Sequence, residues 1–209
     1  MKNIVVLVSG GGTNLQALID AKKRGEIKGG KISCVIASKE GVYALERAAQ
    51  NGIKSCVIPR KEYADIASYT KAVTDKLIEE KADLIVYAGF MTILDEQVVK
   101  AFPYKMMNVH PALIPSFCGK GYYGLHVHEE ALKKGVKVSG ATVHFVTEEC
   151  DGGPIILQEP VAVENDDTPE TLQRRIMENA EWKILPRAVS LFCEDRITIK
   201  DGKAYVDLK

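Results

Sequence analysis

The feature that most constrains this chain is an alternation, through its first half, of short β-branched runs with helix-forming stretches. The apolar runs are almost unbroken, which is the pattern of strands buried on both faces. Five strands are expected: Asn3–Val8, Lys31–Ala37, Lys54–Ile58, Asp83–Ala88 and Met106–Val109. Three helices are expected between them: Asn14–Lys23, Val42–Asn51 and Ile66–Glu80. Strands linked in this way build a doubly wound α/β fold around a mainly parallel, twisted sheet.

After Lys137 the pattern changes to that of an antiparallel portion. Two longer strands, Val138–Val146 and Pro154–Val163, flank a turn-forming segment and are expected to form a hairpin. Two weak strands are expected within residues 197–208.

A helix is expected after the hairpin. Thr168 is suited to be its N-cap and Pro169 its first residue. The helix is expected to reach about Glu181 or beyond, and Pro186 is expected to kink or split its continuation.

Length and charge exclude several classes of protein. With 209 residues and 46% hydrophobic content, one core and a single domain over residues 1–209 are expected. Lysine and arginine total 28 against 28 acidic residues, so no net field attracts nucleic acid or an anionic membrane. The opening apolar run, Ile4–Val8, is too short for a secretory signal, and the five cysteines contain no Cys-x-x-Cys pair. A cytoplasmic protein without disulfides or a metal site is expected.

The segment Ser9-Gly-Gly-Gly-Thr-Asn14 lies between the first strand and the first helix. Such a turn exposes backbone N–H groups at a helix N-terminus, where the helix dipole also favours an anion. The Gly-Lys-Ser/Thr of a P-loop does not follow this turn, and Leu15 stands where the Gly-x-Gly-x-x-Gly motif of dinucleotide-binding proteins needs its third glycine. A phosphate like that of a mononucleotide is therefore favoured over a dinucleotide. A tight turn that needs glycine without any ligand is the alternative.

Asn108 and His110 lie two residues apart at the end of the fifth strand. Their side chains should therefore point together into the space where open α/β sheets bind ligands. An amide beside an imidazole is suited to stabilising an oxygen that gains negative charge. The alternative is a strand-end histidine that bonds a neighbouring carbonyl.

Thr142 and His144 share one face of the strand 138–146, and Asp151 follows in a loop before two glycines. A carboxylate there can orient a histidine or accept a proton. An Asp-Gly pair also forms ordinary turns.

Together these segments resemble the glycinamide ribonucleotide transformylase family over nearly the whole chain. The matching segments are residues 6–16, 88–91, 108–117, 142–146 and 151–158. The resemblance implies that the formyl group of 10-formyltetrahydrofolate is transferred to the amine of glycinamide ribonucleotide, in purine biosynthesis. It also implies a phosphate-binding half, about residues 1–100, and a folate and catalytic half, about 101–209. We expect small-molecule substrates and a monomer or homodimer.

The resemblance assigns roles to individual residues. The catalytic residues are Asn108, His110 and Asp151, with Thr142 and His144 beside them. The ribonucleotide is bound by Gly12, Thr13, Asn14 and Glu181. The pterin of the folate is held by Met91, Thr92, Ile93 and Leu94, with Thr147 on the other side.

The mechanism expected from these roles is direct attack of the amine on the formyl carbon. Asn108 and a protonated His110 stabilise the oxygen, and Asp151 is expected to raise the pKa of His110.

The sequence departs from the family in two places. Thr92 stands where the family often has arginine, so a polar contact to the folate is absent or replaced. The glycine-rich segment 117–126 is longer than in several relatives and forms either a flap over the substrate or a surface excursion. The Ile114-Pro115 bond fits either isomer.

Other interpretations stay open on the residues alone. Cys118 or Cys150 as a nucleophile and the pair His126-Val-His128 as zinc ligands are enzymatic alternatives. A non-catalytic nucleotide-binding module would use only the glycine turn. A methionyl-tRNA formyltransferase would need a further C-terminal domain and a basic surface, and a formyltetrahydrofolate hydrolase would typically carry a further N-terminal one.

Overall fold

The computed structural model describes residues 1–208, and Lys209, the last residue of the expected domain, lies outside them. The chain forms two compact units, one ending at Asn108 and the other starting at Val109. The expectation of a single domain stays a prediction.

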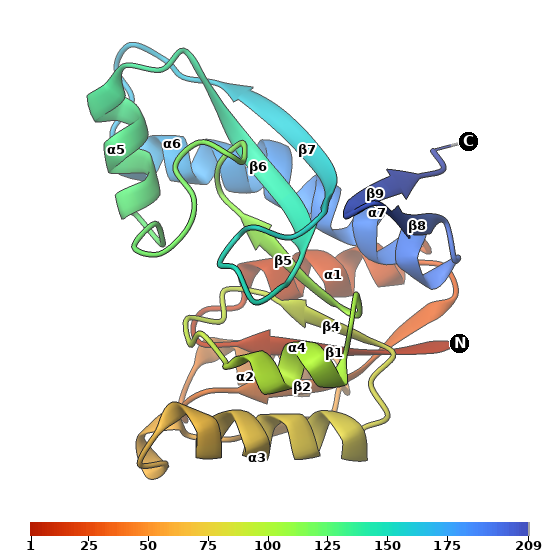
Figure 1. The fold of residues 1–209 in the computed structure, drawn as a ribbon. Helices are drawn as coiled ribbons and strands as arrows, with labels where there is room; N and C mark the ends of the chain where they lie inside the picture. The colour runs from red at the N-terminus through yellow and green to blue at the C-terminus, as the bar shows by residue number, and fades with distance from the viewer. Residues whose placement is uncertain (209) are drawn as a thin grey trace. The chain divides into compact units, whose positions relative to one another are not determined.

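The first unit contains a parallel sheet of the strands that the apolar runs predicted (Figure 1). Its strands are β1 (Lys2–Val8), β2 (Gly30–Ala37), β3 (Ser55–Val57), β4 (Leu84–Tyr87) and the first part of β5 (Met106–His110), whose last two residues belong to the second unit. They lie in the order β3-β2-β1-β4-β5, and each neighbouring pair is parallel. Residues Ile4 to Val8 are fully buried, which explains their unbroken apolar character.

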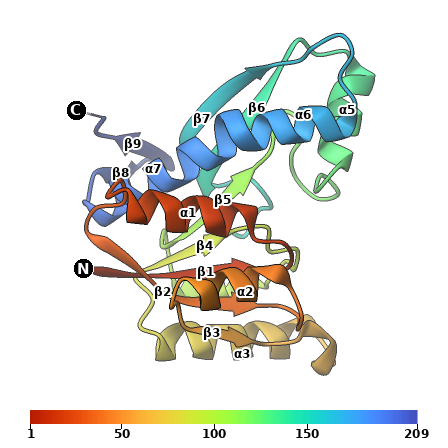
Figure 2. The same ribbon diagram turned by 180° about the vertical axis from the view of Figure 1, so that it is seen from behind.

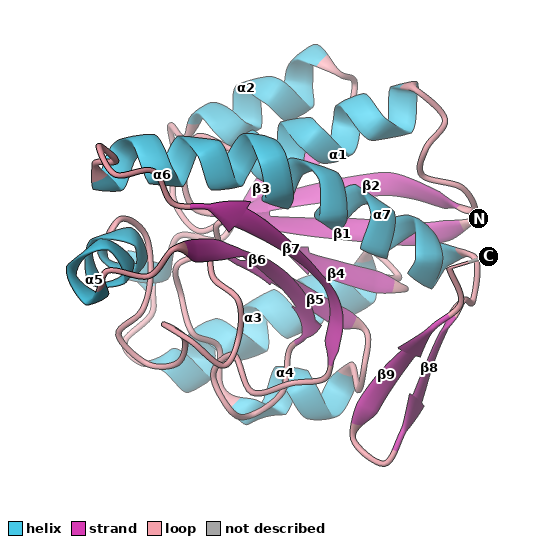
Figure 3. Cartoon of the chain, turned by 90° about the horizontal axis from the view of Figure 1, so that it is seen from above, coloured by secondary structure: helices cyan, strands magenta, loops and turns pink. Residues whose placement is uncertain are grey.

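Helices cover both faces of this sheet, so the expected doubly wound fold is confirmed. They are α1 (Thr13–Lys23), α2 (Tyr43–Gln50), α3 (Ile66–Glu79) and α4 (Glu96–Ala101). Figure 3 shows α1 and α2 on one face and α3 and α4 on the other. Helix α4 and a 3-10 turn at Arg60–Glu62 were not expected, because segments this short contain no helical period.

The second unit is built on the antiparallel hairpin that the sequence predicted. Its strands are β6 (Val138–Phe145) and β7 (Ile155–Ala162), with Ser139 opposite Val161. The helical segments are α5 (His126–Lys134), α6 (Pro169–Ile176), the π segment η2 (Met177–Glu181) and α7 (Trp182–Cys193). Figure 2 shows α6 and α7 running along the hairpin. A small hairpin of β8 (Ile197–Lys200) and β9 (Lys203–Val206) follows.

The helix after the hairpin begins as predicted but is interrupted elsewhere. Thr168 is the N-cap, and its side chain and that of Thr171 bond each other's backbone N–H groups. Pro186 lies inside α7, which continues past it to Cys193, so the expected split is wrong, whereas the expected kink stays a prediction. Pro186 cannot donate to the carbonyl of Trp182. A π segment, Met177–Glu181, directly precedes α7.

Within residues 1–208 no helix has both the length and the apolar character needed to cross a membrane.

Candidate active site

The glycine turn joins β1 to α1. Gly12 is the N-cap of α1 with φ 71°, and a Cβ there would lie 2.7 Å from the Cβ of Ala44, so only glycine fits. Gly10 and Gly11 instead face open space. The cap supplies no side-chain acceptor, and the first turn of α1 has no acidic residue. The amide groups at the start of α1 are therefore suited to an anion.

Arg47 of α2 holds this turn and was not identified from the sequence. Its Nε donates to the carbonyl of Gly11 at 2.8 Å, and its guanidinium also donates to the side chain of Gln16 at 2.9 Å. A positive charge thus lies beside the expected phosphate position. No local motif signals Arg47, because the contact spans 36 residues.

Ser9 connects the glycine turn to the segment after β4. The amide of Met91 donates to the Ser9 hydroxyl at 3.0 Å, and that hydroxyl lies 2.7 Å from the hydroxyl of Ser38. The side chains of Met91 and Ile93 are 56% and 66% exposed, while Thr92 and Leu94 are partly exposed. Residues expected to bind phosphate and pterin are therefore linked within the first unit.

His110, His144 and Asp151 form a buried cluster in the second unit. His110 Nδ1 lies 3.5 Å from one carboxylate oxygen of Asp151, and His144 Nε2 lies 3.5 Å from the other. The backbone amide of Gly119 also donates to Asp151, at 2.9 Å. Asn108 lies two residues before His110 on β5, so the alternation of side chains along the strand puts both on one face.

The protonation of His110 differs from the expectation. Its Nε2 lies 2.8 Å from the carbonyl of Phe117, which can only accept, so Nε2 carries a proton. Burial lowers the pKa of His110, and this outweighs the opposing effects of Asp151 and the Phe117 carbonyl. Asp151 raises the pKa of His110 as expected, but burial lowers it more, so the net shift is downward and the expected imidazolium is wrong: the ring is mainly neutral at pH 7.

Asp151 is fixed by its backbone as well as by its partners. Burial raises its pKa, but the hydrogen bonds from His144 and Gly119 and the charge of His110 lower it more, so the carboxylate is ionised near neutral pH. Asp151 has φ 56°, and a Cβ at Gly153 would overlap the carbonyl oxygen of Phe145. The Asp-Gly-Gly sequence is thus both a turn and the support of the carboxylate.

Thr142 and Gln158 connect the hairpin to the turn after β5. The Thr142 hydroxyl donates to the carbonyl of Ala112 at 2.7 Å and accepts from the amide of Ile114 at 3.1 Å. The Gln158 amide donates to Thr142 and to the carbonyl of Ile114, both at 3.0 Å. The Ile114-Pro115 bond in this turn is cis.

The segment 117–126 bonds to the cluster at its start, through the Phe117 carbonyl and the Gly119 amide. Tyr122 stacks on His126, with ring centroids 5.9 Å apart. These contacts hold the start of the segment beside the cluster, and the choice between a flap and a surface excursion stays a prediction.

Two further expected residues lie elsewhere in the second unit. Glu181 ends η2 and is 6% exposed. Thr147 lies between β6 and β7, where its hydroxyl donates to the carbonyl of Glu149 at 3.3 Å.

The alternatives based on cysteine and zinc gain no support. Burial and then the charge of Asp151 raise the pKa of both Cys118 and Cys150, which disfavours a thiolate nucleophile. His126 is exposed and lies 3.3 Å from Glu129, whereas His128 is fully buried. Among the described residues no three His, Cys, Asp or Glu side chains are grouped to hold a metal ion.

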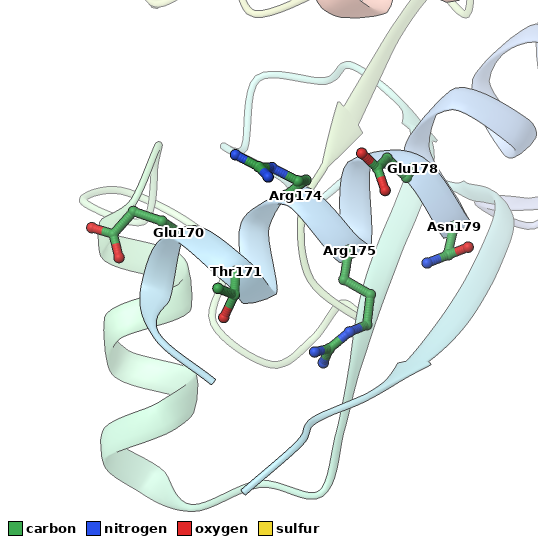
Figure 4. Close-up of a pocket in the computed structure, with 6 residues that line it drawn as sticks. All are labelled: Glu170, Thr171, Arg174, Arg175, Glu178 and Asn179. Carbon is green, nitrogen blue, oxygen red and sulfur yellow. The ribbon is translucent and has the colours of Figure 1, made fainter. Parts of the chain in front are cut away.

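A surface groove lies over α6 and η2 (Figure 4). Its lining residues are Glu170, Thr171, Arg174, Arg175, Glu178 and Asn179. Because Arg175 is paired with Asp167 by two hydrogen bonds, the groove offers less free positive charge than its arginines suggest.

Comparisons with known proteins show the family to which the chain is similar. Residues 2–189 match the family described as formyl transferase. The phosphoribosylglycinamide formyltransferase of Haemophilus influenzae is 42% identical over 209 residues, 100% of this chain and 95% of that protein. The protein of the same name from Escherichia coli is 38% identical over 205 residues, 98% of this chain and 93% of that protein. The crystal structure of glycinamide ribonucleotide transformylase 1 from Symbiobacterium toebii has a TM-score of 0.92 at 39% identity, covering 99% of this chain and 94% of that one.

Proposed function

This chain belongs to the formyl transferase family, and we propose that it transfers the formyl group of 10-formyltetrahydrofolate to the amine of glycinamide ribonucleotide in purine biosynthesis. Relatives 42% and 38% identical over nearly its whole length carry the name phosphoribosylglycinamide formyltransferase. The observation that carries the proposal is Asp151, held 3.5 Å from the rings of both His110 and His144. The products are formylglycinamide ribonucleotide and tetrahydrofolate.

The reaction is direct attack of the substrate amine on the formyl carbon. A carbon–nitrogen bond forms to the amine, the bond from that carbon to the folate nitrogen breaks, and a proton passes from the first nitrogen to the second. No covalent enzyme intermediate is required. The chain must therefore supply hydrogen bonds to the formyl oxygen and a route for one proton.

Asn108 and His110 donate the hydrogen bonds. Asn108 donates through its side-chain amide, and His110 donates through Nε2, which carries a proton in the neutral ring. A neutral imidazole suffices as a donor to a carbonyl oxygen. Neutral His110 replaces the imidazolium that the sequence led us to expect, because burial lowers its pKa.

Asp151, 3.5 Å from Nδ1 of His110, assists the proton transfer between the two nitrogens. Its ionised state at neutral pH suits this task. Thr142 and His144 act through these groups: Thr142 supports the turn after β5, and His144 lies beside the second oxygen of Asp151.

Substrate-binding residues are assigned in each unit. The phosphate is bound by Gly12, Thr13 and Asn14, with the charge of Arg47 beside the turn, and Glu181 binds the ribonucleotide. The exposed apolar side chains of Met91 and Ile93 support a role of Met91, Thr92, Ile93 and Leu94 in holding the pterin, with Thr147 as a further contact.

We also infer that the protein works in the cytoplasm on small molecules, as a monomer or homodimer, and engages neither nucleic acid nor a membrane. The balance of 28 basic and 28 acidic residues supports this.

The test is formyl transfer from 10-formyltetrahydrofolate with glycinamide ribonucleotide, methionyl-tRNA and water as parallel acceptors. We expect transfer to the ribonucleotide alone. Equal or faster transfer to tRNA or water overturns the assigned acceptor. Near-normal turnover in both Asp151→Asn and His110→Ala would remove these residues from the mechanism.

A further inference from the structure

A chain of three hydrogen bonds leads from the outer part of α1 to the glycine turn, all within the first unit. The side-chain amide nitrogen of Gln16 donates to the carboxylate of Asp20 at 2.8 Å, one helical turn further along α1. The amide oxygen of Gln16 accepts from the guanidinium of Arg47 at 2.9 Å, and Arg47 Nε donates to the carbonyl of Gly11 at 2.8 Å. Because a carboxylate only accepts and a guanidinium only donates, the direction of every bond in this chain is fixed.

Arg47 is also held on the face of its guanidinium. Its central carbon lies 4.8 Å from the ring centroid of Tyr43, one turn earlier on α2. The bonds to Gly11 and Gln16 use two of the five N–H groups that an arginine offers. The guanidinium is thus fixed at its edge and on one face.

The peptide between Gly11 and Gly12 is held by Arg47 rather than by packing at Gly11. A Cβ at Gly10 or Gly11 would meet no atom within 4 Å, so the surroundings do not restrict these two residues. In a trans peptide the carbonyl and the following N–H point in opposite directions. The bond from Arg47 to the Gly11 carbonyl therefore also sets the direction of the Gly12 N–H.

The glycine turn presents N–H groups and not carbonyls. The other two glycine carbonyls, of Gly10 and Gly12, accept from the amides of Ala44 and Gln16 at 3.2 and 2.9 Å. The N–H groups of Gly12 and Thr13 donate to no acceptor within residues 1–208. Donors without a protein partner, next to carbonyls that all have one, suit an anion.

We propose that Gln16 is a positioning residue for the phosphate of the substrate: held by Asp20, it fixes Arg47 and through it the Gly11–Gly12 peptide. The inference rests on the phosphate site proposed above and adds to it a residue that acts only through Arg47. Replacement of Gln16 leaves the charge of Arg47 in place, so its effect on affinity reports orientation and not charge.

The test is calorimetric binding of glycinamide ribonucleotide without folate. Gln16→Met keeps the length of the side chain and removes both of its hydrogen bonds. The Kd should rise about fivefold, the equivalent of one typical net hydrogen bond, while kcat at saturating ribonucleotide changes little. Gln97→Met, the same substitution at an exposed position of α4, is the control and should leave the Kd unchanged.

Two variants of Asp20 separate positioning from charge. Asp20→Asn keeps an acceptor for Gln16 and should leave the Kd nearly unchanged, whereas Asp20→Leu removes the acceptor and should raise it. Loss of a negative charge by itself would strengthen the binding of an anion, so a rise in Asp20→Leu has the opposite sign. Both Gln16 and Asp20 are partly exposed, and Asp20→Leu decides the matter if Gln16→Met does not fold.

An equal Kd in Gln16→Met and the unaltered chain, or a lower Kd in Asp20→Leu, overturns the inference and leaves the proposed reaction intact. Absence of ribonucleotide binding in the unaltered chain would instead overturn the proposed function, and this inference with it.

Discussion

His110 shows that a neighbouring charge and burial shift the pKa of one ring in opposite directions. The carboxylate lies 3.5 Å from Nδ1, yet the pKa of His110 is below its ordinary value because burial has the larger effect. The ring therefore enters the proposed reaction neutral, as a hydrogen-bond donor through Nε2.

Asn108→Ala removes one of the two proposed donors to the formyl oxygen. Loss of such a donor typically raises the barrier by about 3 kcal/mol, so kcat should fall about a hundredfold while KM changes little. Steady-state kinetics with both substrates checks this. Asn165→Ala, at an exposed position, is the control and should leave kcat unchanged. A large rise in KM with normal kcat would assign Asn108 to binding instead.

Asp151→Asn should lower the pKa of His110 further, because the carboxylate is a group that raises it. NMR titration of the four histidine rings checks this, with His126→Gln and His144→Gln to assign the signals. In the unaltered chain we expect the His110 signal to titrate below pH 6.5, the ordinary value. A higher pKa in Asp151→Asn would contradict the assigned interaction.

Some of these residues were predictable from the sequence and others were not. Asn108, His110 and Asp151 stand in local patterns, a strand end and an Asp-Gly-Gly turn, so their places in these elements were predictable, whereas their catalytic roles stay proposals. Arg47 could not, because its contact with Gly11 exists only once α2 packs beside the glycine turn. The neutral state of His110 depends on its burial, which no spacing reveals.

Among the elements, β6 and β7 have a role beyond that of a hairpin, because Thr142 and Gln158 brace the turn after β5. Thr142→Val keeps the shape and leaves the Ala112 carbonyl and the Ile114 amide without that partner. We expect a loss of about 2 kcal/mol in the free energy of unfolding. Urea unfolding measures it, with Thr198→Val, at an exposed position of β8, as control. An equal loss in both variants would mean that the bracing contributes nothing.

Helix α2 should matter for the phosphate of the substrate through Arg47. Arg47→Met removes the charge and the bond to Gly11, so KM for glycinamide ribonucleotide should rise about tenfold with a smaller change in kcat. Arg24→Met, which removes an exposed arginine paired with Glu26, is the control for a lost charge. Unchanged KM in Arg47→Met would remove this residue from phosphate binding.

Helices and strands could be predicted from the sequence where nearly every residue of the element is buried. Strands β1 and β4 are buried along nearly their whole length, so an apolar run predicted each of them. The π segment before α7 was not predicted, because a proline indicates a missing N–H group at its own position but not a π turn several residues earlier.

For the molecule as a whole, His128 should make stability depend on pH. Its ring is fully buried, neither ring nitrogen has a hydrogen-bond partner within residues 1–208, and burial followed by the charge of His110 lowers its pKa from 6.5 to about 4. As pH falls below 6.5, His128 of the unfolded chain takes up a proton, whereas His128 of the folded chain stays neutral until about pH 4. The contribution to stability is thus complete above pH 6.5 and is lost between the two values, by about 3 kcal/mol.

His128→Leu should reduce the loss of unfolding free energy as pH falls, and urea unfolding between pH 4 and 8 checks this. The exposed His126 provides the matched control, His126→Leu, which should keep the slope of the unaltered chain. Identical slopes in all three proteins would rule out His128 as the source.

The Phe117 carbonyl, 2.8 Å from Nε2 of His110, has a consequence for how the proposed enzyme treats its substrate. The Phe117 carbonyl oxygen already accepts the hydrogen bond from Nε2 that the formyl oxygen needs. In the protein without substrate this carbonyl is therefore a surrogate for the formyl group. Arrival of the formyl group exchanges one neutral acceptor for another and gains little. Only when that oxygen becomes negatively charged does the bond grow to about twice its strength. The surrogate therefore makes the imidazole selective for the transition state over the bound reactant.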